Sequence, residues 1–427
     1  MQGLALLRSN GIETKYILVR INYIATLSLL FIVVAPPLRT IGSYNFLALI
    51  SLLVWVLTAI MLRPTFFFRP GKLMALNYIF ALAFVAISIV TGNIQLLLRF
   101  FGVFLLLSIQ VMALYYRWFA PWQLERITDH LTMLLFCVSV ISLFHVQELP
   151  YLIRSIDWLY PEYRLRGVGG YELVYALVLL IPVVVYRLKF RRKGWAHSLY
   201  NLAFVGAGSA LVISAGFALA TAVLMGAVIL VLLGPHLSIR VVLRGLVVLL
   251  VIVFASSRLL PVIVNLTRGT PYGDTVLALA QFGQENLGAP VGVDGRTLAY
   301  TLSLNTFLAH PIGGYVFAER IQLGDFASLH DSVRLGQHSL FLDVLAAYGF
   351  FMGALMGYLI FWLPFKLAII NKPILTVTAS TIVSLLGVTF LNNDVPAMGF
   401  VVYFALSSIY FHPNVSVKSP PPCQKVR

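Results

Sequence analysis

The residues best suited to chemistry lie in one stretch, Arg258 to Gly357, which holds five arginines and three histidines but no lysine. A guanidinium group is always charged, and its planar fork binds two phosphate oxygens at once. A neutral imidazole can accept a proton from a hydroxyl group. The arginines therefore indicate binding of phosphate or pyrophosphate, and the histidines are candidates for proton transfer. The five arginines are Arg258, Arg268, Arg296, Arg320 and Arg334.

His338 is the strongest candidate for proton transfer. It directly precedes an apolar segment that begins at Ser339, so we expect it at the N-terminus of a helix. That position disfavours a positive charge and keeps the imidazole neutral. Taken alone, a histidine at a helix start is more often a hydrogen-bonded structural residue, and this interpretation stays open. For His310, just before Pro311, we expect a structural role.

Arg296 opens a segment, GRTLAYTLSLNTFLAHPIGG, that is typical of an amphipathic helix. Pro311 and the glycine pair after it are expected to end this helix. Leu298, Leu302 and Asn305 are expected to share one face. The helix could then lie flat over the mouth of a membrane bundle.

A second group of candidates lies in the shorter segment from Glu148 to Gly170, which ends in Arg164, Arg166 and a glycine cluster. Its tyrosines and tryptophan are typical of a segment at the membrane interface. Glu172 follows at the start of an apolar segment, where a carboxylate is a functional candidate by default. Alternatively, Glu172 only pairs with Arg164 or Arg166, and both interpretations have equal weight.

The elements that must position these residues are membrane helices. Of the 427 residues 60% are hydrophobic and 11% are charged, whereas a soluble domain has about 25% charged residues. About twelve segments have the ~20 mostly apolar residues that a spanning helix needs. We therefore predict an all-α polytopic membrane protein. The predicted spans are Tyr16–Ala35, Ser43–Leu62, Leu73–Val90, Gln95–Tyr116, His130–Gln147, Tyr171–Leu188, Ser198–Ser214, Phe217–Gly234, Leu243–Ser257, Ser339–Leu363, Ile374–Leu391 and Pro396–His412.

Basic residues predict the orientation of these spans. With both termini in the cytoplasm, 20 of the 30 basic residues lie on that side, including all eight lysines. The ten on the outer side are all arginines, which suits an outer face that binds phosphate. Outer carboxylates are alternative partners for any one of them. The outer arginines are Arg39, Arg99, Arg154, Arg164, Arg166, Arg258, Arg268, Arg296, Arg320 and Arg334.

These spans divide the chain into four parts. Residues 1–257 form a bundle of nine spans with a small outer loop at 148–170, and residues 258–338 form a large outer loop. Residues 339–412 form three further spans, and residues 413–427 form a cytoplasmic tail. In a Gram-negative cell the outer loops lie in the periplasm. The N-terminus is expected to stay as an anchor, without a cleavable signal peptide.

The composition also argues against several other classes. The net charge of +15 would suggest a nucleic-acid partner in a soluble protein, but here the topology accounts for most of it. Cys137 and Cys423 lie in a predicted span and in the tail, and neither has metal-ligand spacing around it. We therefore expect no nucleic acid, no disulfide, no metal and no cofactor.

Gly349, Gly353 and Gly357 repeat every four residues in the predicted tenth span. Such spacing lets another helix approach closely. We expect a continuous, tightly packed helix that fixes His338 in place.

The segment from Arg296 to Gly353 resembles the O-antigen ligase and O-antigen polymerase family of bacterial membrane glycosyltransferases. The matching residues are an arginine that opens a loop helix, an HP-x-x-G turn, a histidine followed by a small polar residue, and a glycine further on. They fall on Arg296, on His310-Pro311 with Gly313 and Gly314, on His338-Ser339 and on Gly349. The last small residue of the pattern is replaced by Met352, with Gly353 one position later.

This resemblance implies a metal-independent glycosyltransferase with a GT-C-like fold and a large periplasmic loop before the tenth helix. The donor would be a glycan on undecaprenyl pyrophosphate, used at the outer face of the inner membrane. His338 would assist the attacking hydroxyl, and Arg296 would stabilise the departing pyrophosphate, as fixed cations can do for developing negative charge. The other loop arginines, with Arg164, Arg166 and Glu172, would bind substrate.

The acceptor distinguishes two forms of this function. A polymerase transfers glycan to the hydroxyl of an incoming lipid-linked repeat unit, with a chain-length regulator as a further candidate partner. A ligase transfers it to lipid A-core. The two arginine-bearing loops and the displaced small residue at Met352 favour the polymerase. A transporter without catalysis is a third alternative, but transporters place ionisable groups near the membrane midplane, and these helix interiors are almost free of charge.

Overall fold

The computed structural model consists of helices wherever it describes the chain, and no strand occurs in those parts. Within the described residues, eight helices are long and apolar enough to cross a membrane, which identifies a multi-pass membrane protein by length and composition. The described residues are 2–41, 44–68, 71–93, 97, 100–149, 152–156, 159–190, 194–216, 218–233, 291–318, 335, 339–370, 377, 381, 382, 384, 385 and 399–409, without the side chains of 2–13, 154, 218, 219, 222, 291–299, 363–365 and 367–370.

The long helices match most of the predicted spans. They correspond to the first seven predicted spans and to the tenth. The eighth is a shorter apolar helix, and the twelfth falls on a π-helix and a helical turn. The ninth and most of the eleventh lie outside the described residues. The long helices are α1 (Gln2–Val34), α3 (Tyr44–Leu62), α5 (Lys72–Val90), α7 (Phe101–Phe119), α8 (Pro121–Glu148), α11 (Tyr171–Phe190), α12 (Trp195–Ser214) and α17 (Leu340–Ile370).

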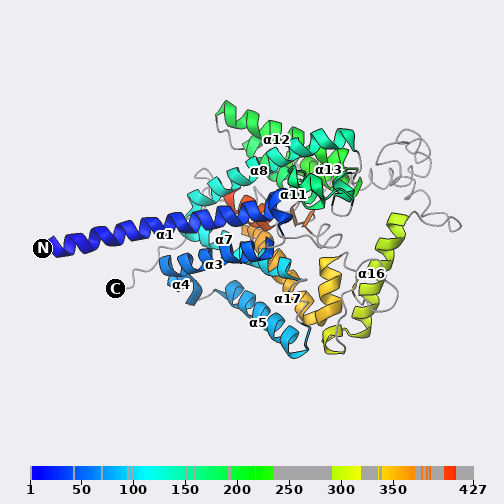
Figure 1. Cartoon of the computed structure of the whole chain (residues 1–427), viewed down its shortest axis with the longest axis horizontal. Coiled ribbons are helices and arrows are strands. Elements are labelled where there is room, and N and C mark those ends of the chain that lie inside the picture. Colours follow the sequence, from blue (N-terminus) through cyan, green and yellow to red (C-terminus); the bar gives the residue numbers. More distant parts are fainter. Residues whose placement is uncertain are drawn as a thin grey trace.

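The other helical elements lie between or after these helices along the chain (Figure 1). Among them, α16 packs along α17 and carries the residues of the predicted loop helix. The remaining elements are α2 (Pro36–Arg39), α4 (Pro64–Phe68), α9 (Leu152–Ser155), α10 (Glu162–Leu165), α13 (Ala218–Leu233), α16 (Val291–Ala309), η2 (Tyr315–Phe317), η5 (Phe400–Ala405) and α20 (Leu406–Ile409).

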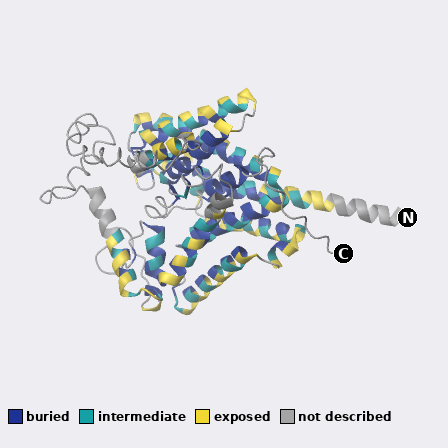
Figure 2. Cartoon of the chain, turned by 180° about the vertical axis from the view of Figure 1, so that it is seen from behind, coloured by how far each residue is buried: buried dark blue, intermediate teal, exposed yellow. Residues whose placement is uncertain are grey.

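The core is built around α11, whose residues 172–187 are buried without a break. Between Glu172 and Arg187 at its two ends, this segment has no charged residue and is apolar on every side, as expected of a helix that other helices surround. It packs against α8, α12, α13 and η5. Figure 2 shows the buried residues gathered inside the bundle, with exposed residues on its outer helices.

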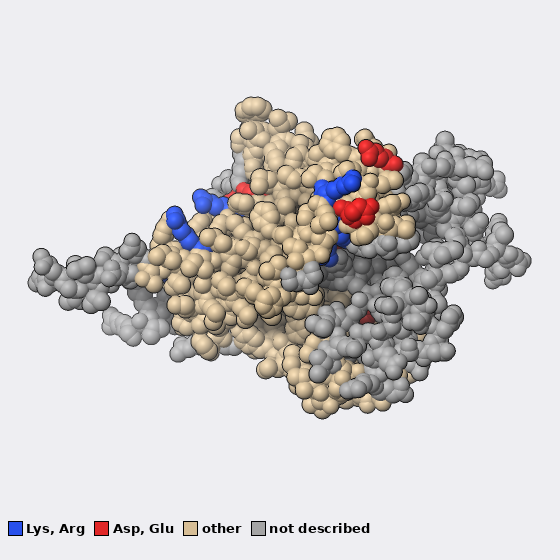
Figure 3. Space-filling model, viewed as in Figure 1, with Lys and Arg blue, Asp and Glu red and all other residues tan. Residues whose placement is uncertain are grey.

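The outer helices turn apolar side chains away from the bundle, as a lipid-facing surface requires. Leu82 and Val90 of α5 are exposed, as are Leu199 and Leu202 of α12. The described surface in Figure 3 accordingly carries few charged side chains. Some polar side chains inside the bundle join two helices by hydrogen bonds; the Asn22 amide, for example, donates to the Thr58 hydroxyl at 2.9 Å.

Several boundaries differ from the prediction. Helix α1 begins at Gln2 and not at Tyr16, α7 begins at Phe101 and not at Gln95, and α17 ends at Ile370 and not at Leu363. Helix α8 begins at Pro121, before the predicted start at His130. Its first turns contain charged residues that lower the hydropathy without interrupting the helix. Helix α16 begins at Val291, so Arg296 lies inside this helix and does not open it.

Candidate functional site

The two segments that carry the motif residues, α16 and α17, lie side by side (Figure 1). The Ser303 hydroxyl of α16 donates to Asp343 Oδ1 of α17 at 2.7 Å, and both residues are buried. Further along, Pro311 and Gly314 meet the residues around Gly349. Residue numbers increase in the same direction along both segments between these two contacts. Helix α16 and the first part of α17 therefore run parallel.

The turn after α16 packs backbone against backbone on α17. The Phe350 N–H donates to the Pro311 carbonyl at 2.8 Å. A Cβ atom added to Gly314 would lie 2.3 Å from the Ala347 carbonyl oxygen, and one added to Gly349 would lie 2.3 Å from the Ile312 carbonyl oxygen. Neither position therefore has room for a side chain.

Both glycines also need their backbone freedom. Gly314 has φ 79° and ψ 169°, and Gly349 has φ 77° and ψ −177°. This region of backbone space is essentially restricted to glycine. The HP-x-x-G turn and the later glycine of the motif are thus two halves of one contact.

Gly349 bends α17 sharply, which corrects the prediction of a continuous helix. The backbone at this residue is not helical, so α17 consists of two arms, residues 340–348 and 350–370. Leu345 of the first arm lies against Gly353 of the second, and Phe341 lies against Gly357. The glycine repeat therefore accommodates the first arm folded back on the second, not a separate helix.

Other helices hold the bend in place. The Tyr348 hydroxyl is 2.7 Å from the Ser88 hydroxyl of α5, and the Tyr348 ring lies 4.4 Å from that of Phe84. On the second arm, the Gln110 side chain of α7 donates to the Leu359 carbonyl at 2.7 Å. Buried contacts from α5 beside the bend and from α7 on the second arm thus hold α17 in this shape.

Arg296 belongs to the end of the α16–α17 pair where α17 begins. It precedes Ser303 by seven residues, about two helical turns, so both residues share one face of α16. At the start of α17, Ser339 is buried, and its hydroxyl accepts a hydrogen bond from the Leu342 N–H at 3.3 Å. The Arg296 side chain and His338 lie outside the described residues.

The face of α16 that packs on the bundle is polar. Ser303 and Thr306 are buried against the bundle, whereas Leu304, Asn305 and Leu308 are exposed. Polar residues with small side chains face α17 because they allow close packing and hydrogen bonding inside a membrane protein. The exposed leucines suit contact with lipid.

His310 has surroundings that fit the expected structural role. It follows the last residue of α16, and its carbonyl accepts a hydrogen bond from the Gly314 N–H at 3.0 Å. Its ring lies edge-on to Tyr315 at 5.4 Å. These contacts shape the turn that meets Gly349.

Glu172 is the centre of a buried ion cluster. Arg164 Nη1 lies 2.7 Å from Glu172 Oε1, and Arg39 Nη1 lies 3.0 Å from the same oxygen. The Gly170 N–H also donates to this oxygen at 3.2 Å. A side chain at Gly170 would collide with both Arg164 and Glu172, which explains the need for glycine here.

The cluster therefore confirms the pairing of Glu172 with Arg164 and adds Arg39 from α2, a partner that the sequence did not indicate. Two guanidinium groups share one carboxylate, so the cluster has an excess positive charge. Arg166, by contrast, is exposed, and its guanidinium lies over the Tyr163 ring at 4.6 Å. Of these arginines, Arg166 is thus the one most open to a ligand.

Replacing Arg164 by glutamine is expected to lower the free energy of unfolding by about 2 kcal/mol, because a buried charge-assisted hydrogen bond is lost while Glu172 keeps Arg39. Arg166→Gln removes an exposed charge and should change this free energy by less than about 0.5 kcal/mol. Thermal unfolding of the purified protein in detergent measures both effects. Equal losses from the two variants would contradict a structural role for the cluster.

Arg258, Arg268, Arg320 and Arg334 lie outside the described residues, as His338 does. Conversely, prediction from the sequence did not identify the Ser303–Asp343 contact. Asp343 carried a signal, since it is a carboxylate near the start of an apolar helix.

No protein-family model and no curated protein matches this sequence. The assignment to a function therefore depends on the motif residues and on the elements that carry them.

Proposed function

We propose that this protein is a polysaccharide polymerase of the bacterial inner membrane that uses a glycan on undecaprenyl pyrophosphate. Its likeness to the O-antigen ligase and polymerase family lies in the motif from Arg296 to Gly353. One observation supports the proposal most: the parallel pairing of α16 and α17, joined by Ser303 and Asp343. This pairing brings the helix that contains Arg296 beside the start of the helix that follows His338.

The proposed reaction needs one base and one cationic site. The acceptor hydroxyl oxygen attacks the anomeric carbon of the donor, and its proton passes to the imidazole of His338. The bond from the anomeric carbon to the pyrophosphate oxygen breaks, and undecaprenyl pyrophosphate leaves with the electron pair. Arg296 and the other loop arginines stabilise the negative charge that develops on this leaving group.

The surroundings of the site complete the proposal. About twelve spans in a GT-C-like arrangement, with both termini in the cytoplasm, place the large loop in the periplasm. Arg166 is exposed on the smaller loop and is available to a phosphate of either substrate. The Arg39–Glu172–Arg164 cluster holds the end of that loop against α11, with Arg164 and Glu172 in a supporting role.

The glycan profile of a deletion strain tests the proposal and separates it from the ligase alternative. A strain without the polymerase attaches single repeat units to lipid A-core. A strain without the ligase has bare core and accumulates long lipid-linked chains. An unchanged profile of both lipid-linked and core-linked glycan would contradict both forms of the function.

Arg296→Lys is expected to lower the rate of glycan transfer by about tenfold or more, because lysine keeps the charge but loses the bidentate fork. Transfer from a lipid-linked donor in isolated membranes measures this rate. Arg126→Lys is a matched control, since Arg126 is exposed and lies over Trp122 on α8. Full activity of Arg296→Lys would show that Arg296 contributes only its positive charge and not its bidentate fork.

A further inference from the structure

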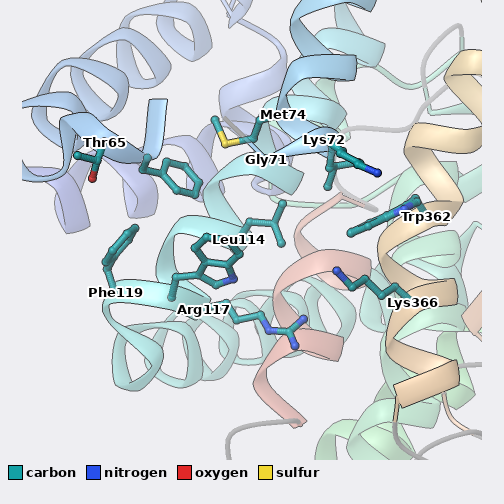
Figure 4. Close-up of a pocket in the computed structure, with 12 residues that line it drawn as sticks. Thr65, Gly71, Lys72, Met74, Leu114, Arg117, Phe119, Trp362 and Lys366 are labelled. Carbon is teal, nitrogen blue, oxygen red and sulfur yellow. The ribbon is translucent and has the colours of Figure 1, made fainter. Parts of the chain in front are cut away.

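A cavity of about 430 Å³ opens between α4, α5, α7 and the second arm of α17 (Figure 4). It lies at the far end of this arm from Gly349, because its α17 residues are Trp362 and Lys366. The charge pattern of the sequence assigns this end of the bundle to the cytoplasm. The cavity is therefore separate from the proposed catalytic site.

Three basic side chains line this cavity, and none of the twelve described lining residues is acidic. Lys72 begins α5, Arg117 lies in the last turn of α7, and Lys366 belongs to α17. Three different helices thus each contribute one cation to the same space. Lys366 Nζ lies 4.4 Å from the centre of the Trp362 ring, which holds this ammonium group at the wall of the cavity.

The rest of the lining is apolar. Phe66, Leu73 and Met74 are buried at the wall, and Phe119 lies beside them. Trp118 also lines the cavity and is largely exposed, so the apolar wall continues onto the outer surface of the bundle. Tryptophan in such a position is typical of the level of lipid headgroups.

We propose that this cavity binds the headgroup of an anionic phospholipid. The three cations match the phosphate of the headgroup, and the apolar wall matches the first part of an acyl chain. Basic pockets between membrane helices on the cytoplasmic side are suited to such headgroups. A free phosphate could also bind the three cations, but it has no apolar part to contact the apolar wall.

A lipid in this position connects α5, α7 and the second arm of α17. The opposite end of α5 contacts Tyr348, next to the bend, through Ser88. The lipid therefore stabilises α5 and α7, the two helices that hold α17 near its contact with α16 at the other end of the bundle.

The test uses the full-length protein in nanodiscs of phosphatidylcholine, with or without phosphatidylglycerol. Native mass spectrometry counts the lipids retained after release from the disc. Phosphatidylglycerol is expected to be retained in preference, and Lys72→Gln with Lys366→Gln should weaken this binding by about 25-fold, or about fivefold per residue. Equal retention of the two lipids, or an unchanged preference in the double variant, would overturn the proposal.

Two controls keep the result specific. Arg126→Gln removes an exposed cation outside the cavity and should leave the lipid preference unchanged. If the double variant does not fold, as judged by its helical circular dichroism, Lys366→Gln alone replaces it, with a fivefold loss expected. Inorganic phosphate added to phosphatidylcholine discs should not raise the unfolding temperature; a rise equal to that from phosphatidylglycerol would identify a site for a soluble anion and overturn the lipid assignment.

Discussion

His338→Ala is expected to lower the rate of glycan transfer by about 100- to 10,000-fold, which is the usual contribution of a general base. Without the imidazole, the acceptor hydroxyl must lose its proton to water during the attack. The change removes no bulky apolar group, so the protein should still insert and fold. The rate is measured with a lipid-linked donor in isolated membranes, and the amount of folded protein by size-exclusion chromatography in detergent.

The matched control for this variant is His130→Ala. His130 lies on α8, and its ring packs edge-on to Tyr23, far in sequence from the motif. This variant should transfer glycan at the normal rate. If His338→Ala also makes normal polymer, His338 has no part in the mechanism and the structural interpretation of this residue holds.

Gly349→Ala is expected to lower the free energy of unfolding by about 3 kcal/mol or more. The backbone conformation at Gly349 is strained for any other residue, and the added methyl group would lie 2.3 Å from the Ile312 carbonyl oxygen. Relief requires the 311–314 turn to separate from α17, which also breaks the hydrogen bond from Phe350 to Pro311. Thermal unfolding in detergent measures the loss.

Gly357→Ala provides the matched control in the same helix. A methyl group there would lie 3.1 Å from the edge of the Phe341 ring, which can shift. Alanine is also favoured over glycine in a helix by about 1 kcal/mol. This variant should therefore lose little or no stability, and a loss as large as that of Gly349→Ala would show that general crowding matters more than the bend.

The apolar helices could be predicted from the sequence because length and hydropathy alone define a spanning segment. Helix α3 begins at Tyr44, one residue from its predicted start. Helix α8 was predicted too short because Glu125, Arg126 and Asp129 lower the hydropathy of its first turns. Hydropathy detects the part of a helix that contacts lipid, whereas the hydrogen bonds of the backbone continue beyond it.

The ion cluster could be predicted only in part. Glu172 and Arg164 are eight residues apart, so their pairing was among the expected alternatives. Arg39 is remote in sequence, and the charge pattern assigns it only to the same side of the membrane. The contact itself depends on how α2 and α10 pack together, which no local pattern specifies.

The bend at Gly349 could not be predicted from the sequence, for a different reason. A glycine every four residues fits a helix that packs against another helix and equally fits a hairpin whose own arms pack together. The choice depends on a distant turn, residues 310–314, whose backbone occupies the space at Gly349. The structure of the glycine repeat is thus decided by a tertiary contact and not by the repeat itself.

The bend in α17 also bears on how this chain enters a membrane. Residues Leu340–Trp362 form one apolar stretch that is long enough to cross by itself. The first arm alone, with its nine residues, spans only about 14 Å of a hydrocarbon layer of about 30 Å. We therefore expect the insertion machinery to recognise a single crossing segment, with the fold at Gly349 forming later, when the turn after α16 docks. The second arm, residues 350–370, is about 31 Å long and is therefore long enough to cross by itself, so we expect this rearrangement to leave every later segment on its original side.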